Sequence, residues 1–597
     1  MLRFIILYLC TTVLSVVISN EQYKTVKTKS GLVRGLRQYT IWHEKPFYSF
    51  RGIPYAKPPV GELRFKATEP VDPWSNIIDA FEYPPRCSQR YKSSRPTSEN
   101  CLFLNIFVPD LKRTINLAVL LYFHGGFFAS GSGDDKGFGP DFMIEHEIIL
   151  VTMNYRLGML GFMNLGIPDY SGNMGLKDQQ MTLEWIYKNI EAFGGDKNKI
   201  TIGGSSAGGR SAGFHLINDE SSKYFNQMLS ISGTPNGIYN YQKGDHRCLA
   251  KIFYDKCTST ISNKMWRLFG LEKTKEPPSD EELVDFLKNV DVDKITDFTR
   301  QTTNDLFSPW SPIVEKSNAK HPFLLEDPMS KLQKTKINKT AYYTFAEFEY
   351  IILIHSNASY SKDIGTIHRN AHVEIPIFGH RTLFRKKRSY LEDVFKRIRK
   401  FYFSNALTDE EKLRQRLIMD SDYYFVYFIE KWVEKHVAVS NKKTFYHRFS
   451  AHTILNPHNI FEGASHGDET FYLFRCRDYN DLYKYIFNQD NSNTTIASGV
   501  MHNLQMLITN FVKNGKPLNN GDPDEYFLPV RRSSEAHQFH CIDVTNDGIV
   551  HGLIGPNGNR TKILDNIVEE VKILIEEHGD TITKTPIEQQ CDEIIGW

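Results

Sequence analysis

The sequence predicts an α/β protein built on a mostly parallel β-sheet that helices cover. Residues 117–123 and 147–154 are short, largely apolar runs of the kind found in buried strands. Residues 177–193 place apolar side chains at helical spacing, and residues 199–203 form another short apolar run that ends in a glycine-rich turn. Strand, helix and strand in this order are typical of a βαβ unit, whose strands run parallel.

The composition is that of a folded globular protein. Of the 597 residues, 41% are hydrophobic and 24% are charged, so the chain can bury a large core. Lys and Arg total 72 against 70 Asp and Glu, and the net charge of +2 gives no reason to expect a nucleic-acid partner. The length alone suggests about four domains at roughly 150 residues each, yet no linker divides the chain.

The first residues predict export. Arg3 precedes a mainly apolar run over residues 4–18, and the small Ser19 comes before polar residues, which is the layout of a secretory signal peptide over residues 1–19. An uncleaved anchor is the alternative, but the run is short for a transmembrane helix. No other segment is long and apolar enough to span a membrane. We therefore expect a secreted, extracellular protein with no membrane span in its mature chain, residues 20–597.

Cysteine usage agrees with an oxidising compartment. Once Cys10 is removed with the signal, two close pairs could each close a short loop by a disulfide worth about 3 kcal/mol, Cys87 with Cys101 and Cys248 with Cys257. The partners of three further cysteines stay open: Cys476, Cys541 and Cys591. No Cys/His cluster has the spacing of a zinc site, so no metal site is predicted.

Four Asn-x-Ser/Thr sequons are candidate glycan acceptors on the secretory route. They are Asn338, Asn357, Asn493 and Asn559.

A nucleophilic serine is the strongest chemical signal. Residues 204–208 read GSSAG, which fits the G-x-S-x-G pattern between a strand and a helix and nominates Ser206. Such a sharp turn pushes the serine hydroxyl outward, and only small neighbours fit its crowded backbone. The following helix N-terminus favours developing negative charge. A plain Gly/Ser turn is the alternative, because the motif by itself is weak.

The wider sequence resembles the type-B carboxylesterases, the family that contains the cholinesterases. Residues 193–208, FGGDKNKITIGGSSAG, are similar to its nucleophile signature, and residues 98–109, SENCLFLNIFVP, to its second signature. Similar blocks are RGIPYAKPP at 51–59, NYRLG at 154–158 and GNMGLKDQ at 172–179. The resemblance runs from about residue 25 to residue 575. It implies an α/β-hydrolase fold with large insertions around a deep gorge, and a bond between Cys101 and Cys87.

The resemblance also nominates a base and an acid. In this fold the acid and then the histidine follow the serine along the chain. Residues 463–469, GASHGDE, resemble the histidine loop and point to His466. Glu349 is our choice for the acid, because apolar residues follow it at the family's spacing, while Glu347 is the competitor. Tyr350 stands where the family has glycine.

An oxyanion hole is expected from residues 124–128, HGGFF, which resemble the family's oxyanion loop. Backbone N–H groups of Gly125, Gly126 and Phe127, with that of Ala207, would meet the oxyanion. Phe127 departs from the family's Gly or Ala, and its ring could narrow the acyl pocket. Ser205 also departs, because a Glu commonly precedes the nucleophile.

These residues predict a secreted serine carboxylesterase that acts on small-molecule esters without a metal or organic cofactor. The three triad candidates span 260 residues and must converge, which predicts one catalytic domain over residues 20–597. The alternatives are a catalytically inactive, cholinesterase-like binding or adhesion protein and a slow-turnover esterase that sequesters xenobiotics. The family's choline site uses a Trp inside the first disulfide loop, and residues 88–100 contain none, so the resemblance does not imply a choline site here. The oligomeric state and the physiological ester stay open.

Overall fold

The structure is a computed structural model. It describes residues 22–109, 116–237, 240–258, 278–303, 308–351, 388–406, 408–458, 462–489, 491–518, 528–530, 540–554 and 558–578, together with 587 and 591. The predicted signal peptide, residues 1–19, lies outside the described residues.

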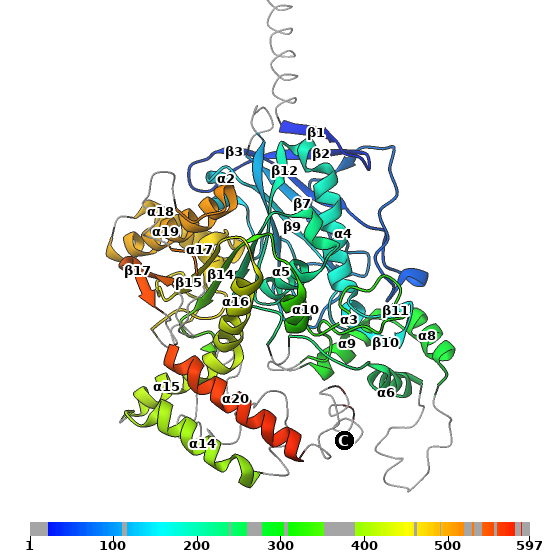
Figure 1. The fold of residues 1–597 in the computed structure, drawn as a ribbon. Helices are drawn as coiled ribbons and strands as arrows, with labels where there is room; N and C mark the ends of the chain where they lie inside the picture. Colours follow the sequence, from blue (N-terminus) through cyan, green and yellow to red (C-terminus); the bar gives the residue numbers. More distant parts are fainter. Residues whose placement is uncertain are drawn as a thin grey trace, which may run out of the picture.

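A large mixed sheet forms the centre of the described molecule (Figure 1). Its strand order is β1-β2-β3-β7-β9-β8-β12-β13-β14-β15-β16-β17, and β4 pairs with β2. The block from β9 to β16 is parallel, as the sequence predicts, whereas the strands at both edges are antiparallel. The strands are β1 (Tyr23–Lys27), β2 (Leu32–Tyr39), β3 (Pro46–Pro54), β4 (Ile78–Asp79), β7 (Phe103–Val108), β8 (Leu117–Phe123), β9 (Ile149–Met153), β12 (Gly195–Ser205), β13 (Gln227–Ile231), β14 (Thr340–Ala346), β15 (Thr444–Phe449), β16 (His540–Thr545) and β17 (Gly548–Ile554).

Helices cover both faces of this sheet, so the central strands are buried on both sides. Every residue of β8 is buried, and alternate side chains face opposite ways: Val119 and Leu121 belong to one hydrophobic core, Leu120 and Tyr122 to the other. The first core is closed mainly by α4 (Met174–Asn189), α5 (Ala207–Ile217) and α16 (Tyr427–Val439). The second is closed by α2 (Asp141–Glu145), α17 (Glu469–Leu473), α18 (Asn480–Asn488) and α19 (Ser492–Asn514).

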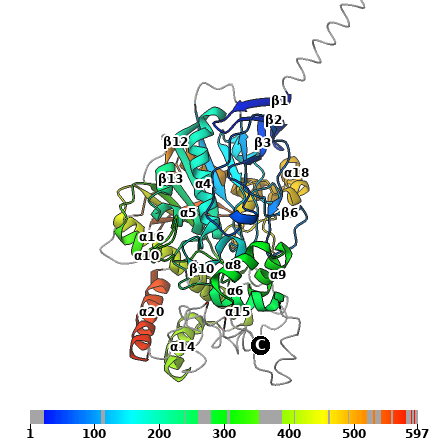
Figure 2. The ribbon, with the colours of Figure 1, turned by 90° about the vertical axis from the view of Figure 1, so that its right-hand side faces the viewer.

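Further helices gather at the end of the molecule opposite β1 and β2 (Figures 1 and 2). Three of them share a separate small hydrophobic core: α14 (Arg388–Phe403), α15 (Asp409–Ser421) and α20 (Gly558–His578). The others are α6 (Arg247–Thr258), α8 (Asp280–Asn289) and α9 (Val292–Thr302). Helix α10 (Pro328–Lys334) lies nearer the middle of the molecule, against α5 and α16. These elements are insertions around the sheet.

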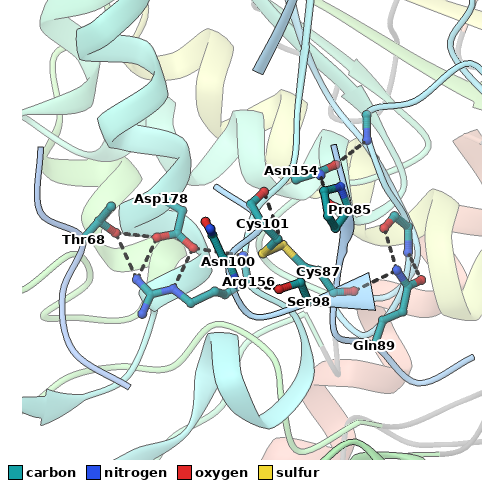
Figure 3. The surroundings of a disulfide bond; sticks show 12 residues. Thr68, Pro85, Cys87, Gln89, Ser98, Asn100, Cys101, Asn154, Arg156 and Asp178 are labelled. Carbon is teal, nitrogen blue, oxygen red and sulfur yellow. Dashed lines mark hydrogen bonds and ion pairs between the residues drawn. A yellow bond between two sulfur atoms is a disulfide. The ribbon is translucent and has the colours of Figure 1, made fainter. Parts of the chain in front are cut away.

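Two of the motif blocks meet in a buried ion pair beside the first disulfide (Figure 3). Arg156, which follows β9, donates to Asp178 of α4 from Nε at 2.9 Å and from a terminal nitrogen at 2.7 Å. The predicted bond between Cys87 and Cys101 is present. Gln89 Nε2 donates to the Cys87 carbonyl at 3.0 Å within the disulfide loop. Its amide also exchanges hydrogen bonds with the backbone of Gly131, at 3.0 and 3.2 Å, which tie the loop to the segment after the predicted oxyanion loop. The pairing implied by the resemblance is confirmed.

The predicted pairing of Cys248 with Cys257 is wrong. Both residues lie on α6, nine positions apart, where the helix separates their α-carbons by roughly 13 Å and turns their side chains to opposite faces. A disulfide needs α-carbons within about 7 Å. Cys248 instead bonds Cys591, with a Cα–Cα distance of 6.3 Å. Cys257, Cys476 and Cys541 form no disulfide with any described residue.

Three of the four sequon asparagines lie among the described residues. Asn338 and Asn493 are exposed, as glycan attachment requires, and Asn559 belongs to the first turn of α20. Asn357 lies outside the described residues. Glycosylation at these sites stays a prediction.

Among the described residues, no helix combines the length and the apolar character that crossing a bilayer requires.

Candidate active site

Ser206 occupies a sharp turn between β12 and α5. Its backbone has φ 59° and ψ −120°, a conformation that L-residues rarely adopt and that costs about 1–3 kcal/mol. Its N–H donates to the carbonyl of Ile231 in the adjacent strand β13 at 2.8 Å, which anchors the turn. Ala207 then begins α5 directly after the serine. The predicted strand–serine–helix context of the motif is therefore present.

The flanking glycines are needed because the backbone packs closely there. A β-carbon added to Gly204 would lie 2.5 Å from the carbonyl oxygen of Phe123, and one added to Gly208 would lie 2.0 Å from the same atom. Both distances are far below van der Waals contact. The glycines thus let the end of β8 approach the turn that carries Ser206.

Glu349 and His466 meet although 117 residues separate them in the sequence. Phe348 and Ser465 form a short parallel bridge, which joins the segment after β14 to the histidine loop. Next to this bridge, His466 Nδ1 lies 2.5 Å from Glu349 Oε2. Glu349 is fully buried, and its other oxygen accepts from the N–H of Ala346 at 2.8 Å. The bond at Nδ1 leaves Nε2 of His466 for a partner in the cavity.

Glu347, the competing acid, lies elsewhere. Its carboxylate forms a 3.4 Å ion pair with Arg414, a residue of α15. Burial raises its pKa, and the Arg414 charge acts in the opposite direction. The structure therefore brings Glu349, and not Glu347, to His466.

Tyr350, which replaces the family's glycine, packs into the wall around the site. Its ring stacks on Tyr424 at 5.1 Å between centroids, and its N–H donates to the Ser421 hydroxyl at 3.1 Å. The substitution leaves the bond between Glu349 and His466 in place.

The histidine loop is held by residues that the sequence analysis did not assign. Asp468 Oδ2 accepts from the N–H of Ser465 at 2.8 Å and from Asn456 Nδ2 at 2.6 Å. The ring of Phe425 lies 4.6 Å from the imidazole of His466, between centroids. Asp468 lies in the GASHGDE block and could have been found there. Phe425 could not, because it lies in a π-helical turn, Asp422–Val426, with no sequence signal.

The predicted oxyanion loop lies against the nucleophile turn. A β-carbon added to Gly125 would lie 3.2 Å from Cβ of Ser206. His124 shapes the loop, because its Nδ1–H donates to the Gly125 carbonyl at 2.8 Å while its ring stacks on Tyr155. Burial lowers the pKa of His124 to about 4, so its ring is neutral at physiological pH.

The resemblance nominates four backbone N–H groups as oxyanion donors, and none of them has an acceptor among the described residues. They belong to Gly125, Gly126, Phe127 and Ala207. Phe127 has φ 60° and Phe128 has φ 57°. Two consecutive non-glycine residues in this region are unusual, and they turn successive N–H groups toward a common side.

A cavity of about 860 Å³ opens at this point. Ser206, His466, Gly126 and Phe127 all line it, so the structure brings the predicted serine, histidine and oxyanion loop to one space. Glu349 lies behind His466, away from the cavity lining. The volume is in the range of small-molecule sites.

A second buried carboxyl group lies near Glu349. Glu469 follows the histidine loop, is 1% exposed and accepts a 3.3 Å bond from the Thr344 hydroxyl. Burial, and then the negative charge of Glu349, raise the pKa of Glu469 well above its usual range. This shift favours the protonated form of Glu469.

This arrangement predicts how Glu469→Gln alters the pH dependence of stability. Above about pH 4.3 the unfolded chain ionises at position 469 while the folded protein keeps its proton. Wild-type stability then falls by about 1.4 kcal/mol per pH unit from this group until the folded pKa is reached. Glutamine removes that loss, so the melting temperature of the variant should rise relative to wild type as the pH increases above about 4.3. Parallel melting-temperature profiles for the two proteins would contradict the prediction.

Comparison with known proteins agrees with the fold. The family model described as the carboxylesterase family matches residues 22–551. Juvenile hormone esterase of Tribolium castaneum is 36% identical over 320 residues, and the alignment covers 52% of this chain and 52% of that protein. The chain thus spans about half the length of that relative. Esterase B1 of Culex pipiens is 27% identical over 554 residues, covering 88% of this chain and 94% of that protein.

A solved structure is also similar. The crystal structure of juvenile hormone esterase from Manduca sexta, with OTFP covalently attached, is 26% identical with a TM-score of 0.74, covering 92% of this chain and 100% of that chain. The predicted α/β-hydrolase fold is confirmed by this likeness and by the mixed sheet with helices on both faces. On the match over residues 22–551, the chain belongs to the carboxylesterase family.

Proposed function

We propose that the protein is a carboxylic ester hydrolase that works through an acyl-enzyme on Ser206. The observation that carries this proposal is the 2.5 Å contact between Glu349 and His466 beside the cavity that both His466 and Ser206 line. A serine needs a base and an orienting acid to become a nucleophile. Family membership and the esterase relatives support the same reaction class.

The reaction follows from the proposed roles. His466 Nε2 takes the proton of Ser206 as Oγ attacks the ester carbonyl, and Glu349 holds the imidazole in the required tautomer and stabilises its charge. The N–H groups of the oxyanion loop and of Ala207 donate to the tetrahedral oxyanion. The alcohol leaves with the proton from His466, and a water molecule activated by the same nitrogen releases the acid. In this reaction the chain supplies the nucleophile, the base, the orienting acid and the oxyanion donors, while the ester and water are the reactants.

An inactive binding protein is the alternative class, and a covalent probe separates it from an enzyme. Diisopropyl fluorophosphate should abolish hydrolysis of para-nitrophenyl acetate and add one diisopropylphosphoryl group per chain. A protein that neither hydrolyses the ester nor takes up the probe would be a binding fold. Stoichiometric labelling with very slow ester turnover would instead support a sequestering esterase. The covalently attached OTFP of the Manduca sexta relative is consistent with a protein of this fold that carries a reactive nucleophile.

Export is proposed with the catalytic role. Two disulfides, at Cys87–Cys101 and Cys248–Cys591, fit an oxidising compartment, and residues 1–19 have the pattern of a signal peptide. N-terminal sequencing of the exported protein should begin near residue 20. A retained N-terminus in a cell-associated protein would contradict this part of the proposal.

Phe127 is expected to restrict the acyl group. A residue whose N–H meets the oxyanion places its side chain within a few ångströms of the acyl carbon, and a benzyl group there leaves less room than the family's Gly or Ala. The wild-type protein should therefore favour acetyl and propionyl esters over octanoyl esters. Phe127→Gly, which also relieves the positive φ of 60°, should raise kcat/KM for the octanoyl ester relative to the acetyl ester by about tenfold or more. A wild-type preference for long chains would contradict this prediction.

A further inference from the structure

Arg210 is an unusual cation in the wall of the cavity. It lies on α5, one helical turn after Ser206, and its backbone N–H donates to the Ser206 carbonyl at 2.9 Å. The residue is 6% exposed, yet it lines the cavity that Ser206 and His466 line. Its Nε is buried with no hydrogen-bond partner among the described residues.

In the part of the chain that the structure describes, the lack of an ion-pair partner for Arg210 is exceptional among the buried cations. Six Arg and Lys residues are buried in the described part of the chain, and buried cations are rarely left without a carboxylate. Five of the six have one within 2.7 Å: Arg64 with Glu99, Arg86 with Asp134, Arg156 with Asp178, Lys177 with Glu315 and Arg416 with Asp420. Arg210 has no ion pair with any described residue.

The contacts of Arg210 do not replace that missing anion. Its guanidinium lies over the ring of Phe127, 5.7 Å from the centroid, which orients the side chain beside the oxyanion loop. Burial lowers the pKa of Arg210 to about 10, an effect that the charge of Glu349 partly opposes. The side chain is therefore charged at neutral pH and incompletely compensated.

The acidic groups on the cavity wall are already engaged. Asp134 accepts from Arg86 at 2.6 Å, and Asp468 accepts from the N–H of Ser465 and from Asn456. Asp478, the third acidic residue of the lining, lies 3.7 Å from Arg477. The exposed Lys92 and Lys136 add positive charge to the lining. The field in the cavity thus favours a negatively charged ligand over a cationic one.

We propose that Arg210 binds an anionic group of the substrate, so that the preferred esters carry a carboxylate or similar anion a few bonds from the scissile carbonyl. The inference rests on the proposed function, because it places this second group relative to Ser206. Arginine suits the task, since its planar guanidinium can donate to both oxygens of a carboxylate. The five other buried cations pair with carboxylates of the chain. For Arg210, the anionic group of the ligand takes the place of such a carboxylate.

A series of acetyl thioesters tests the proposal. The alcohol part carries trimethylammonium in acetylthiocholine, a neutral isostere in neohexyl thioacetate, and a carboxylate in S-acetyl mercaptopropionate. The wild-type enzyme should show the highest kcat/KM for the carboxylate and the lowest for the choline ester. Arg210→Gln should lower the ratio of carboxylate to neutral ester by about tenfold to a hundredfold, and Arg210→Lys should retain part of it. Lys92→Gln, a charge loss at an exposed position of the same cavity, should shift the ratio less.

Monophenyl adipate and phenyl heptanoate form a second pair, with the anion on the acyl side. A preference confined to one pair identifies whether Arg210 receives the acyl or the alcohol part. If Arg210 acts only through Glu349, Arg210→Gln will change kcat/KM for every substrate by the same factor, and that result would overturn the proposal. So would a wild-type preference for the neutral esters in both pairs.

Failure of the proposed function is recognised separately. In that case the wild-type protein does not hydrolyse neohexyl thioacetate, or its hydrolysis of this ester persists in Ser206→Ala. Calorimetric titration of the Ser206→Ala protein with S-acetyl mercaptopropionate then still tests Arg210. Binding should weaken by about tenfold or more when Arg210→Gln is added, whereas equal affinities would overturn the inference.

Discussion

Ser206→Ala should lower kcat for para-nitrophenyl acetate by about 10⁴- to 10⁶-fold, the largest effect expected of any single change. Alanine removes the attacking oxygen and leaves the turn itself intact, because the anchoring bond to Ile231 is made by the backbone N–H. The residual rate should come from the oxyanion donors and from binding alone.

The neighbouring serine offers a matched control. Ser205 is the last residue of β12, is 6% exposed and carries the same hydroxyl one position earlier. Ser205→Ala should retain most of the activity, because its side chain has no role in the proposed reaction. Equal losses in the two variants would indicate damage to the turn, and an active Ser206→Ala protein would refute the assignment of the nucleophile.

Glu349→Gln should lower kcat by about 10³- to 10⁴-fold. The amide keeps the size of the side chain but cannot stabilise the imidazolium, and its NH₂ group favours the wrong tautomer of His466. The bond to Ala346 can persist through the amide oxygen, so the fold should be preserved. The losses of Glu349→Gln and Ser206→Ala should not add in the double variant, because both residues serve one step.

Glu347→Gln provides the control for this prediction. Glu347 lies two residues away and pairs with Arg414 on the partly exposed face of α15. The variant should remain active within a few-fold. A greater loss in Glu347→Gln than in Glu349→Gln would mean that the acid was assigned to the wrong residue.

The elements nearest the chemistry were the easiest to predict. A short apolar run such as β8, which ends at a glycine-rich turn, is typical of a strand buried on both faces. The turn around Ser206 admits little but Gly, Ala and Ser at its flanks. Glu349 was chosen over Glu347 by spacing. In the structure, Oε2 of Glu349 lies 2.5 Å from Nδ1 of His466.

Long-range contacts were harder to predict. Proximity in the sequence favoured a bond between Cys248 and Cys257, but a helix separates them, and the real partner of Cys248 lies 343 positions along the chain. The antiparallel edges of the sheet were missed because pairing direction depends on chain routing and not on periodicity. Arg210 lies two residues after the nucleophile signature, yet only the burial and the ion pairs of the described residues show that it has no carboxylate partner among them.

The position of a covalent label tests the central claim most directly. After reaction with diisopropyl fluorophosphate, fragmentation of the peptide that contains Ser205 and Ser206 assigns the phosphoryl group to one of two adjacent serines. We expect full modification of Ser206, none of Ser205, and loss of the label in Ser206→Ala. A label on Ser205 or on a residue outside this turn, or no label on a protein that hydrolyses para-nitrophenyl acetate, would contradict the account.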